Sequence, residues 1–175
     1  MVSGRVWKFG DNINTDLMLP GHAALLPPDE QVRVVFQANR PGWVDEVRSG
    51  DIILGGRSYG LGSSRHAARS LRNLGVACVV AESLSRLFFR NCVNWGLLAL
   101  DCPGVHAAFE EGQTAEVSCE TWTVRNRDTG RTFQAKPVPE MLLALMTGGG
   151  IYPVLQRRGL IAGPPQSASK SRGMR

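Results

Sequence analysis

Three short apolar runs, separated by segments with helical periodicity, occupy the middle of the chain and restrict its fold. Continuous apolar runs of four to six residues are typical of strands that are buried on both faces, as in a parallel sheet. We therefore predict a β-α-β unit with parallel strands, extended by a second helix and a third strand. Ser83 is expected to cap the second helix and Gly96 to end it. The predicted strands that contain these runs are residues 51–55, 76–81 and 97–100, and the helical segments are residues 65–74 and 84–95.

The flanking segments extend this unit at both ends. Alternation of polar and apolar residues predicts a first strand at 4–9, and a turn-rich loop follows at 10–16, where polar side chains could cap turns or line a site. Asp29 is expected to cap a helix that continues to about Phe36, and residues 43–47 favour a further helical turn. The C-terminal part predicts antiparallel strands at 114–118, 121–126 and 131–135, a helix at 139–146 and a last strand at 151–155.

The fold class that follows is α/β, with a mixed sheet, flanking helices and an antiparallel C-terminal section. A chain of 175 residues favours one folded domain, which we place at residues 1–162. Residues 163–175 are rich in Pro, Ser and Gly, and we expect them to form a disordered basic tail.

The formal net charge of +5 comes from the C-terminal end. No Asp or Glu follows Glu140, whereas the last 19 residues carry five basic side chains, so the folded body is neutral. We therefore do not expect nucleic-acid binding, because a short basic tail is usually a solvated end. The chain has no run of roughly 20 apolar residues and no leader-like start, so we expect no membrane span and a cytoplasmic location. The five basic residues are Arg157, Arg158, Lys170, Arg172 and Arg175.

The four cysteines show no metal-binding spacing. Cys78, Cys92, Cys102 and Cys119 form no Cys-x-x-Cys pair and have no set of histidines nearby. We expect them to be reduced, buried small residues, and we expect no metal site within this chain.

A glycine- and serine-rich stretch, Tyr-Gly-Leu-Gly-Ser-Ser-Arg-His at 59–66, lies where the first buried strand leads into a helix. Gly60 and Gly62 allow a sharp turn and a close approach of the backbone to a ligand. Ser63, Ser64 and Arg65 add hydroxyls and a guanidinium beside the free N–H groups of the helix start, which suits a carboxylate or a phosphate. The local pattern alone also fits a serine that merely caps the helix and an arginine in solvent.

Five motifs occur in order along the chain: FGDNINTD at 9–16, GDII at 50–53, GLGSSR at 60–65, AESLSRLFFRN at 81–91 and GLL at 96–98. Together they give the chain a resemblance to the small subunits of 3-isopropylmalate dehydratase, the free-standing form of the aconitase-superfamily swivelling domain. The resemblance extends from about residue 4 to residue 155 and implies a swivelling β/β/α fold.

This resemblance implies a two-chain hydro-lyase that dehydrates and rehydrates a small hydroxy-dicarboxylate, here 2-isopropylmalate and 3-isopropylmalate in leucine biosynthesis. It implies a [4Fe–4S] cluster held by cysteines of a separate large subunit, with no cofactor bound by this chain alone. By position, Ser63 would be the catalytic base and Arg65 would bind the substrate carboxylate, while Gly60, Gly62 and Ser64 would shape the substrate site.

The chain departs from the family pattern in three places. An acidic residue that usually follows the arginine is absent, so that His66 comes directly after Arg65, and Leu61 stands where the family often has cysteine. The loop after Pro20 lacks the usual tyrosine and arginine, and it offers His22, Ala23 and Ala24 instead.

The changed loop bears on the choice of substrate. A loop without arginine disfavours tricarboxylate substrates, including that of a homoaconitase, and an apolar loop suits a branched alkyl group. The alternatives are the small subunit of a related dehydratase, for another alkylmalate such as 2,3-dimethylmalate or of a homoaconitase, and a binding or regulatory module that has lost catalysis.

Overall fold

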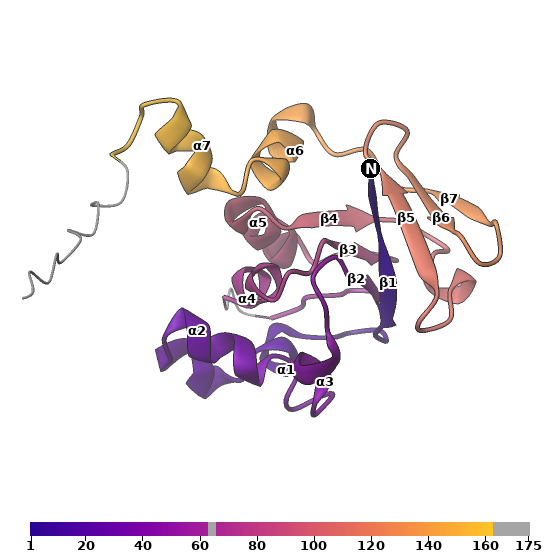
Figure 1. Ribbon diagram of the computed structural model, residues 1–175, viewed down its shortest axis with the longest axis horizontal. Coiled ribbons are helices and arrows are strands. Elements are labelled where there is room, and N and C mark those ends of the chain that lie inside the picture. The colour runs from indigo at the N-terminus through magenta and orange to yellow at the C-terminus, as the bar shows by residue number, and fades with distance from the viewer. Residues whose placement is uncertain (63–65, 163–175) are drawn as a thin grey trace, which may run out of the picture.

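The computed structural model describes residues 1–62 and 66–162, and a seven-stranded mixed sheet runs through these residues (Figure 1). The strand order is β4-β3-β2-β1-β5-β6-β7. The four strands from β4 to β1 are parallel, whereas β1, β5, β6 and β7 pair antiparallel, which confirms the predicted fold class. The strands are β1 (Val2–Lys8), β2 (Ile52–Gly55), β3 (Cys78–Ala81), β4 (Leu98–Asp101), β5 (Thr114–Ser118), β6 (Thr123–Asn126) and β7 (Thr132–Gln134).

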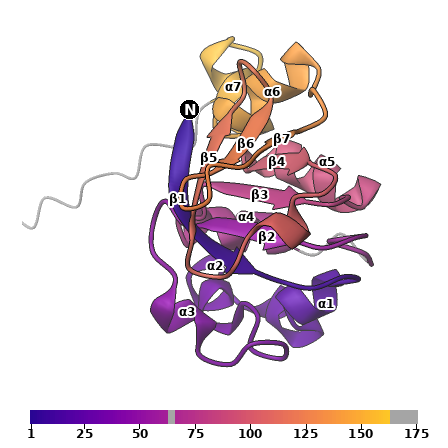
Figure 2. The ribbon, with the colours of Figure 1, turned by 90° about the vertical axis from the view of Figure 1, so that its right-hand side faces the viewer.

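Strand β1 belongs to both parts of the sheet. Its second half pairs in parallel with β2, in the register Val6 to Ile52, and its first half pairs antiparallel with β5, in the register Val2 to Val117. The ribbon β5–β7 therefore turns away from the parallel strands at β1 (Figure 2). The carboxyl ends of the four parallel strands are left for loops to cover.

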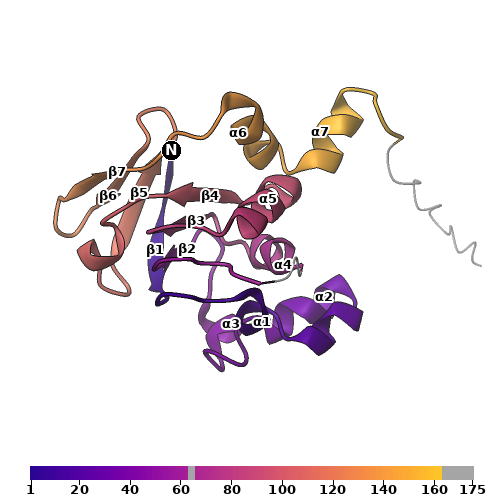
Figure 3. The same cartoon turned by 180° about the vertical axis from the view of Figure 1, so that it is seen from behind.

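Two helices connect the parallel strands and lie next to each other on one side of the sheet (Figures 1 and 3). They are α4 (Ala67–Asn73) and α5 (Arg86–Trp95). Leu71 of α4 and Phe88 of α5 are fully buried against the strands. Gly96 ends α5 with φ +71°, as predicted.

The long connection from β1 to β2 forms short helical turns around an aromatic cluster. Phe9 stacks on Phe36 at 4.2 Å, and the ring of Trp43 meets Phe36 edge-on at 4.9 Å.

The predicted cap at Asp29 is wrong, because the helix begins at Pro28, where a proline fits the first helical position. The turns are α1 (Thr15–Met18), η1 (Gly21–Leu25), α2 (Pro28–Gln31), η2 (Val32–Val34) and α3 (Trp43–Glu46).

The C-terminal elements η3 (His106–Ala108), α6 (Glu140–Thr147) and α7 (Ile151–Arg157) follow β4 and the ribbon. The predicted last strand at 151–155 is wrong, because this segment is helical and packs beside α5. Gly150 adopts φ +100° and redirects the chain, and Pro153 falls in the first helical turn, where its missing N–H costs nothing. The predicted tail at 163–175 lies outside the described residues.

The cysteines behave as small core residues. Cys78, Cys92 and Cys102 are buried, Cys119 is half-buried, and all four are free thiols. Burial raises the pKa of the Cys102 thiol to about 12. Among the helices of residues 1–62 and 66–162, none has the length and apolar character needed to cross a membrane.

Asp51 is a buried carboxylate that joins β1 to the start of β2. One of its oxygens accepts hydrogen bonds from Arg5 at 2.8 Å, from the indole of Trp7 at 2.7 Å and from the backbone N–H of Arg48 at 2.9 Å. Burial alone would raise the pKa of Asp51, but these donors and the charge of Arg5 outweigh it and hold the pKa below its ordinary value. The charged form of Asp51 therefore stabilises the fold.

We expect Asp51→Asn to lower the free energy of unfolding by about 1–3 kcal/mol at pH 7. Because the folded-state pKa lies below the unfolded one, this stabilisation is present above about pH 4 and disappears as the pH falls through the folded pKa. Urea unfolding at pH 7 and pH 3 measures the difference, with the exposed Asp45→Asn as the control. An equal loss at both pH values would show that the charge is not the cause.

Candidate active site

The loops after the parallel strands meet at one edge of the sheet. In open sheets of this kind, ligands bind outside the carboxyl ends of the strands. Residues 9–16, 60–62 and 82–85, which belong to three of the sequence motifs, follow β1, β2 and β3 at this edge. These motifs are far apart in the sequence, and the parallel pairing of the strands brings them together.

Backbone hydrogen bonds join the loop after β1 to the loop after β2. The N–H of Gly60 donates to the carbonyl of Ile13 at 2.7 Å, and the N–H of Thr15 donates to Leu61 at 2.7 Å. Asn14 caps α1 by accepting from the N–H of Leu17 at 2.8 Å. The backbone of the first motif thus fixes the position of the glycine loop from one side.

The loop after β3 holds the glycine loop from the other side. The N–H of Tyr59 donates to the carbonyl of Ser83 at 2.9 Å, and the N–H of Ser85 donates to Tyr59 at 2.8 Å. The hydroxyl of Ser85 donates to the carbonyl of Gly60 and accepts from the N–H of Phe88, so it caps α5. The predicted cap at Ser83 is wrong, because its hydroxyl accepts instead from the N–H of Ser58 at 2.9 Å.

Both glycines of the motif adopt left-handed backbone conformations, with φ +81° at Gly60 and +99° at Gly62. A Cβ at Gly60 would lie 2.3 Å from the ring of Phe88, whereas a Cβ at Gly62 would lie 3.1 Å from the hydroxyl of Thr15. The sharp turn predicted here is confirmed, and packing against α5 makes Gly60 the more restrictive of the two positions.

The predicted catalytic and binding residues Ser63, Ser64 and Arg65 lie outside the described residues. The structure describes their flanks, Gly62 and His66, and places the start of α4 at Ala67. Their assignment therefore stays a prediction from the motif.

His66 precedes α4, and its ring meets Trp95 edge-on at 5.9 Å. Burial and then the nearby charge of Arg69 lower the pKa of His66, which favours a neutral imidazole. A neutral ring at this point adds no positive charge to the motif.

The loop that was predicted to select the substrate forms η1. Ala23 is fully buried, His22 is exposed, and Leu25 is 91% exposed. Ala24 belongs to the same turn. Leu25 is the large apolar side chain that this turn presents to solvent.

A link between η1 and α4 was not predictable from the sequence. Gln31 is buried and donates to the carbonyl of Leu26 at 2.9 Å, and Arg69 donates to Gln31 at 2.9 Å. The guanidinium of Arg69 also lies 4.9 Å from the centre of the Trp95 ring. Arg69 therefore ties the end of η1 to the helix that follows the glycine-serine motif.

A polar hollow of about 550 Å³ opens at the same edge, and sequence analysis did not identify it. Its acidic groups already accept backbone hydrogen bonds, Asp11 from Arg57 at 2.7 Å and Glu82 from Gly104 and His106 at 2.8 Å each. Within residues 1–62 and 66–162, no group of three or more His, Cys, Asp or Glu side chains could hold a metal ion. These contacts join the loops after β1, β2, β3 and β4 to one another.

Comparison with known proteins places this chain in a family. A family model described as the aconitase C-terminal domain matches residues 28–104. The chain is 42% identical over 161 residues to a 3-isopropylmalate dehydratase small subunit of Methanopyrus kandleri, covering 91% of this chain and 95% of the relative. The chain belongs to the 3-isopropylmalate dehydratase small-subunit family.

Further members of the 3-isopropylmalate dehydratase small-subunit family support this placement. An isopropylmalate/citramalate isomerase small subunit of Methanocaldococcus jannaschii is 38% identical over 160 residues, which are 90% of this chain and 95% of the relative. A crystal structure of a 3-isopropylmalate dehydratase from the same organism superposes with a TM-score of 0.84 at 26% identity, covering 91% of this chain and 95% of that chain. The predicted family and the swivelling-domain fold are therefore confirmed.

The cysteines of this 3-isopropylmalate dehydratase small-subunit family member do not fit an iron–sulfur cluster. Cluster ligands are thiolates. Cys78, Cys92 and Cys102 are buried, and burial raises the pKa of each thiol, so these side chains stay protonated. A cluster in the working enzyme would have to be held by another chain.

Ser85 offers a test of how the glycine loop is held. We expect Ser85→Ala to lower the free energy of unfolding by about 1–2 kcal/mol, because it removes the cap of α5 and the hydrogen bond to Gly60. We also expect faster amide hydrogen exchange at Gly60, measured by NMR. Ser83→Ala is the matched control, since it removes only the acceptor for Ser58; equal exchange at Gly60 in both variants would contradict the role of Ser85.

Proposed function

We propose that this chain is the small subunit of a two-chain hydro-lyase that interconverts 2-isopropylmalate and 3-isopropylmalate by removing and re-adding water. The observation that carries the proposal is the convergence of the described parts of three family motifs, at residues 9–16, 60–62 and 81–91, on one edge of the sheet. The similarity to the Methanopyrus kandleri small subunit over 95% of that relative supports it further.

In this proposal, Ser63 removes the proton next to a substrate carboxylate. Such a carbon acid is weak, so a serine oxygen can act as base only where N–H groups and positive charge stabilise its alkoxide. Gly60 and Gly62 adopt left-handed conformations shortly before α4 begins, and the first backbone N–H groups of a helix have no partner within the helix itself. Arg65 binds a substrate carboxylate through two parallel hydrogen bonds, which a lysine could not reproduce.

The large subunit of this proposal holds the [4Fe–4S] cluster, because the cysteines of the small subunit do not fit one. When bound there, the cluster supplies a Lewis acid for the departing hydroxyl. The role of the small subunit is to bring its serine and arginine to the substrate.

The η1 turn favours alkylmalates as substrates. It carries no arginine for an additional carboxylate, and it presents Leu25, which the enzyme could use to contact an alkyl group once the partner covers it. The Methanocaldococcus jannaschii relative is named for both isopropylmalate and citramalate. Citramalate, with a methyl group in place of the isopropyl group, is therefore the second candidate substrate, ahead of 2,3-dimethylmalate and homocitrate-type acids.

The test is to purify the small subunit together with its large subunit under anaerobic conditions, with the cluster intact. The hydration rates of isopropylmaleate, methylmaleate and dimethylmaleate are measured from the decrease in the ultraviolet absorbance of the substrate's double bond. We expect hydration of isopropylmaleate with the highest kcat/KM, and no activity of either subunit alone.

Inactivity with all three alkylmaleates in an assembled, cluster-containing complex would contradict the proposal. That result would favour a binding or regulatory module that keeps the fold without the chemistry.

A further inference from the structure

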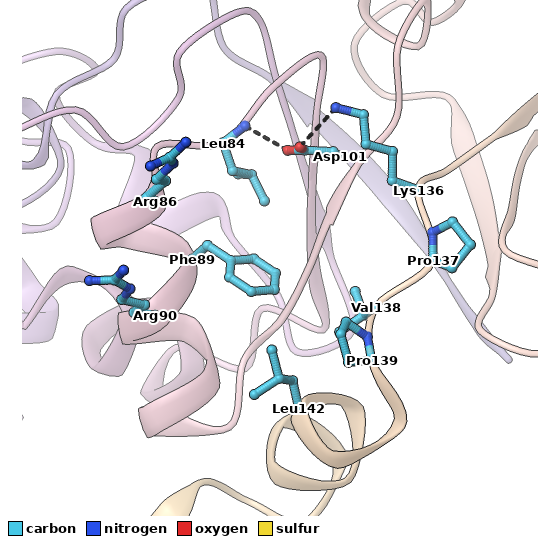
Figure 4. A pocket seen from close by; sticks show the side chains of 10 residues that line it. All are labelled: Leu84, Arg86, Phe89, Arg90, Asp101, Lys136, Pro137, Val138, Pro139 and Leu142. Atoms are coloured by element: carbon cyan, nitrogen blue, oxygen red, sulfur yellow. Dashed lines mark hydrogen bonds and ion pairs between the residues drawn. The ribbon is translucent and has the colours of Figure 1, made fainter.

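A second hollow, of about 380 Å³, lies between α5, the end of β4 and the segment that leads into α6 (Figure 4). Its floor is apolar and includes Leu84, Phe89, Val138 and Leu142. A mainly apolar hollow of this size with a few polar groups is typical of a site that receives a ligand or a partner side chain. Leu84 and Phe89 belong to the motif at 81–91, but the sequence assigned no individual role to any of these four residues.

The rim of this hollow is positively charged. Arg86 and Arg90 lie on the α5 wall, and Lys136 lies on the facing wall (Figure 4). Asp101 is the single carboxylate among the ten lining residues, and it already accepts from the N–H of Leu84 at 2.7 Å and pairs with Lys136 at 3.4 Å. Within the described ranges 1–62 and 66–162, neither Arg86 nor Arg90 makes a hydrogen bond or an ion pair.

The two arginines occupy positions that the helix itself disfavours. Arg86 is the first residue of α5, where the helix dipole repels a cation, and the first turn contains no acidic residue. Arg90 follows four residues later on the same face, and like charges at this spacing repel each other. An external anion would relieve both effects.

The hollow also adjoins the candidate active site. Leu84 forms an isolated bridge with Tyr59, and its neighbour Ser85 binds Gly60. If the proposed function holds, the large subunit must approach this edge of the sheet, because its cluster has to reach the substrate. The hollow therefore lies where a partner surface is required.

We propose that this hollow receives an acidic segment of the large subunit, whose carboxylates pair with Arg86 and Arg90 while an apolar side chain fills the floor around Phe89 and Leu142. This inference rests on the proposed function. Charge complementarity favours an acidic segment over a small anion, because Arg86 and Arg90 lie on one wall, Lys136 lies on the facing wall, and the open centre between the walls is apolar (Figure 4). Arg86 and Arg90 are about 6 Å apart along the helix axis, so they suit two separate carboxylates.

The test measures the affinity of the small subunit for its purified large subunit at 50 mM and 300 mM salt, with surface plasmon resonance under anaerobic conditions. We expect Arg90→Glu to weaken binding at least about tenfold at low salt, mainly through slower association, and less at high salt. Arg90→Glu also replaces a repulsive pair in α5 with an attractive one, so its melting temperature should not fall.

Arg48→Glu is the matched control, because it makes the same charge change on an exposed residue just before β2, at the opposite edge of the sheet. We expect its affinity for the large subunit to stay within about twofold of the wild type. Equal binding of Arg90→Glu and the wild type, in a complex that retains dehydratase activity, would overturn the docking proposal.

Two further results separate the possible failures. A wild-type complex that assembles with a charge-dependent affinity at Arg90 but hydrates no alkylmaleate would contradict the proposed function and leave the docking surface supported. A small carboxylate such as 4-methylpentanoate could instead raise the melting temperature of the isolated wild-type chain but not that of Arg90→Glu. If Arg90→Glu also bound the large subunit as tightly as the wild type, the occupant would be a small carboxylate and the docking proposal would be overturned.

Discussion

Replacing Ser63 with alanine is expected to lower the kcat of the assembled enzyme by about 10²–10⁴-fold, with little change in the amount of heteromer formed. The physical reason is that the proton next to the carboxylate needs a positioned base, and alanine offers none. Hydration of isopropylmaleate by the purified complex, with the cluster content measured in parallel, gives kcat and KM separately. A drop in kcat with an unchanged KM would assign the loss to the chemical step.

Two control variants sharpen this experiment. Ser64→Ala keeps the proposed base and should lose much less activity than Ser63→Ala. Arg65→Lys keeps the charge but loses the two-pronged geometry, so we expect it to act mainly by raising KM for a dicarboxylate. If Ser63→Ala retained wild-type kcat in a complex with an intact cluster, Ser63 would not be the base.

The parallel half of the sheet was predictable because its signals are local and agree with one another. Apolar runs at β2, β3 and β4 alternate with helices, and Gly96 ends α5 where the apolar periodicity ends. The predicted boundaries of these strands differ from the observed ones by only one or two residues. A parallel β-α-β order then determines that the loops with the motifs share one edge, so the place of the candidate site followed from the sequence.

The errors occurred where tertiary contacts decide between two acceptable local structures. Residues 151–155 contain isoleucine, tyrosine and valine, which favour a strand, but packing beside α5 makes the segment helical. Ser83 and Ser85 are both suitable helix caps, and the pairing of Ser83 with Ser58 leaves Ser85 for α5. A sequence cannot rank such options without the neighbouring loop.

Contacts between distant segments account for what sequence analysis missed at the site. Arg69 and Gln31 are 38 residues apart, and nothing in either local pattern indicates that they form a hydrogen bond. The hollow between α5 and α6 depends on how the segment before α6 packs against Phe89. Both features appear only when the elements are placed in space.

Gly60→Ala is expected to lower the free energy of unfolding by about 2–5 kcal/mol and to impair catalysis in whatever protein still folds. A left-handed residue with a side chain costs about 1–2 kcal/mol, and forcing a group into a packed core costs a further 1–3 kcal/mol. Both costs apply at Gly60, because its φ is +81° and a new Cβ would lie 2.3 Å from the buried ring of Phe88. Urea unfolding of the isolated chain measures the loss.

Gly62→Ala is the matched control. The same change two residues later also places a side chain on a left-handed backbone, but it creates little of the steric clash. Its φ is +99°, but a Cβ there would lie 3.1 Å from the hydroxyl of Thr15, which can move by a few tenths of an ångström. We therefore expect a loss of about 1–2 kcal/mol at Gly62. Equal losses at the two positions would show that contact with Phe88 does not fix Gly60, whereas a larger loss at Gly60 means that α5 holds the glycine loop in place through this contact.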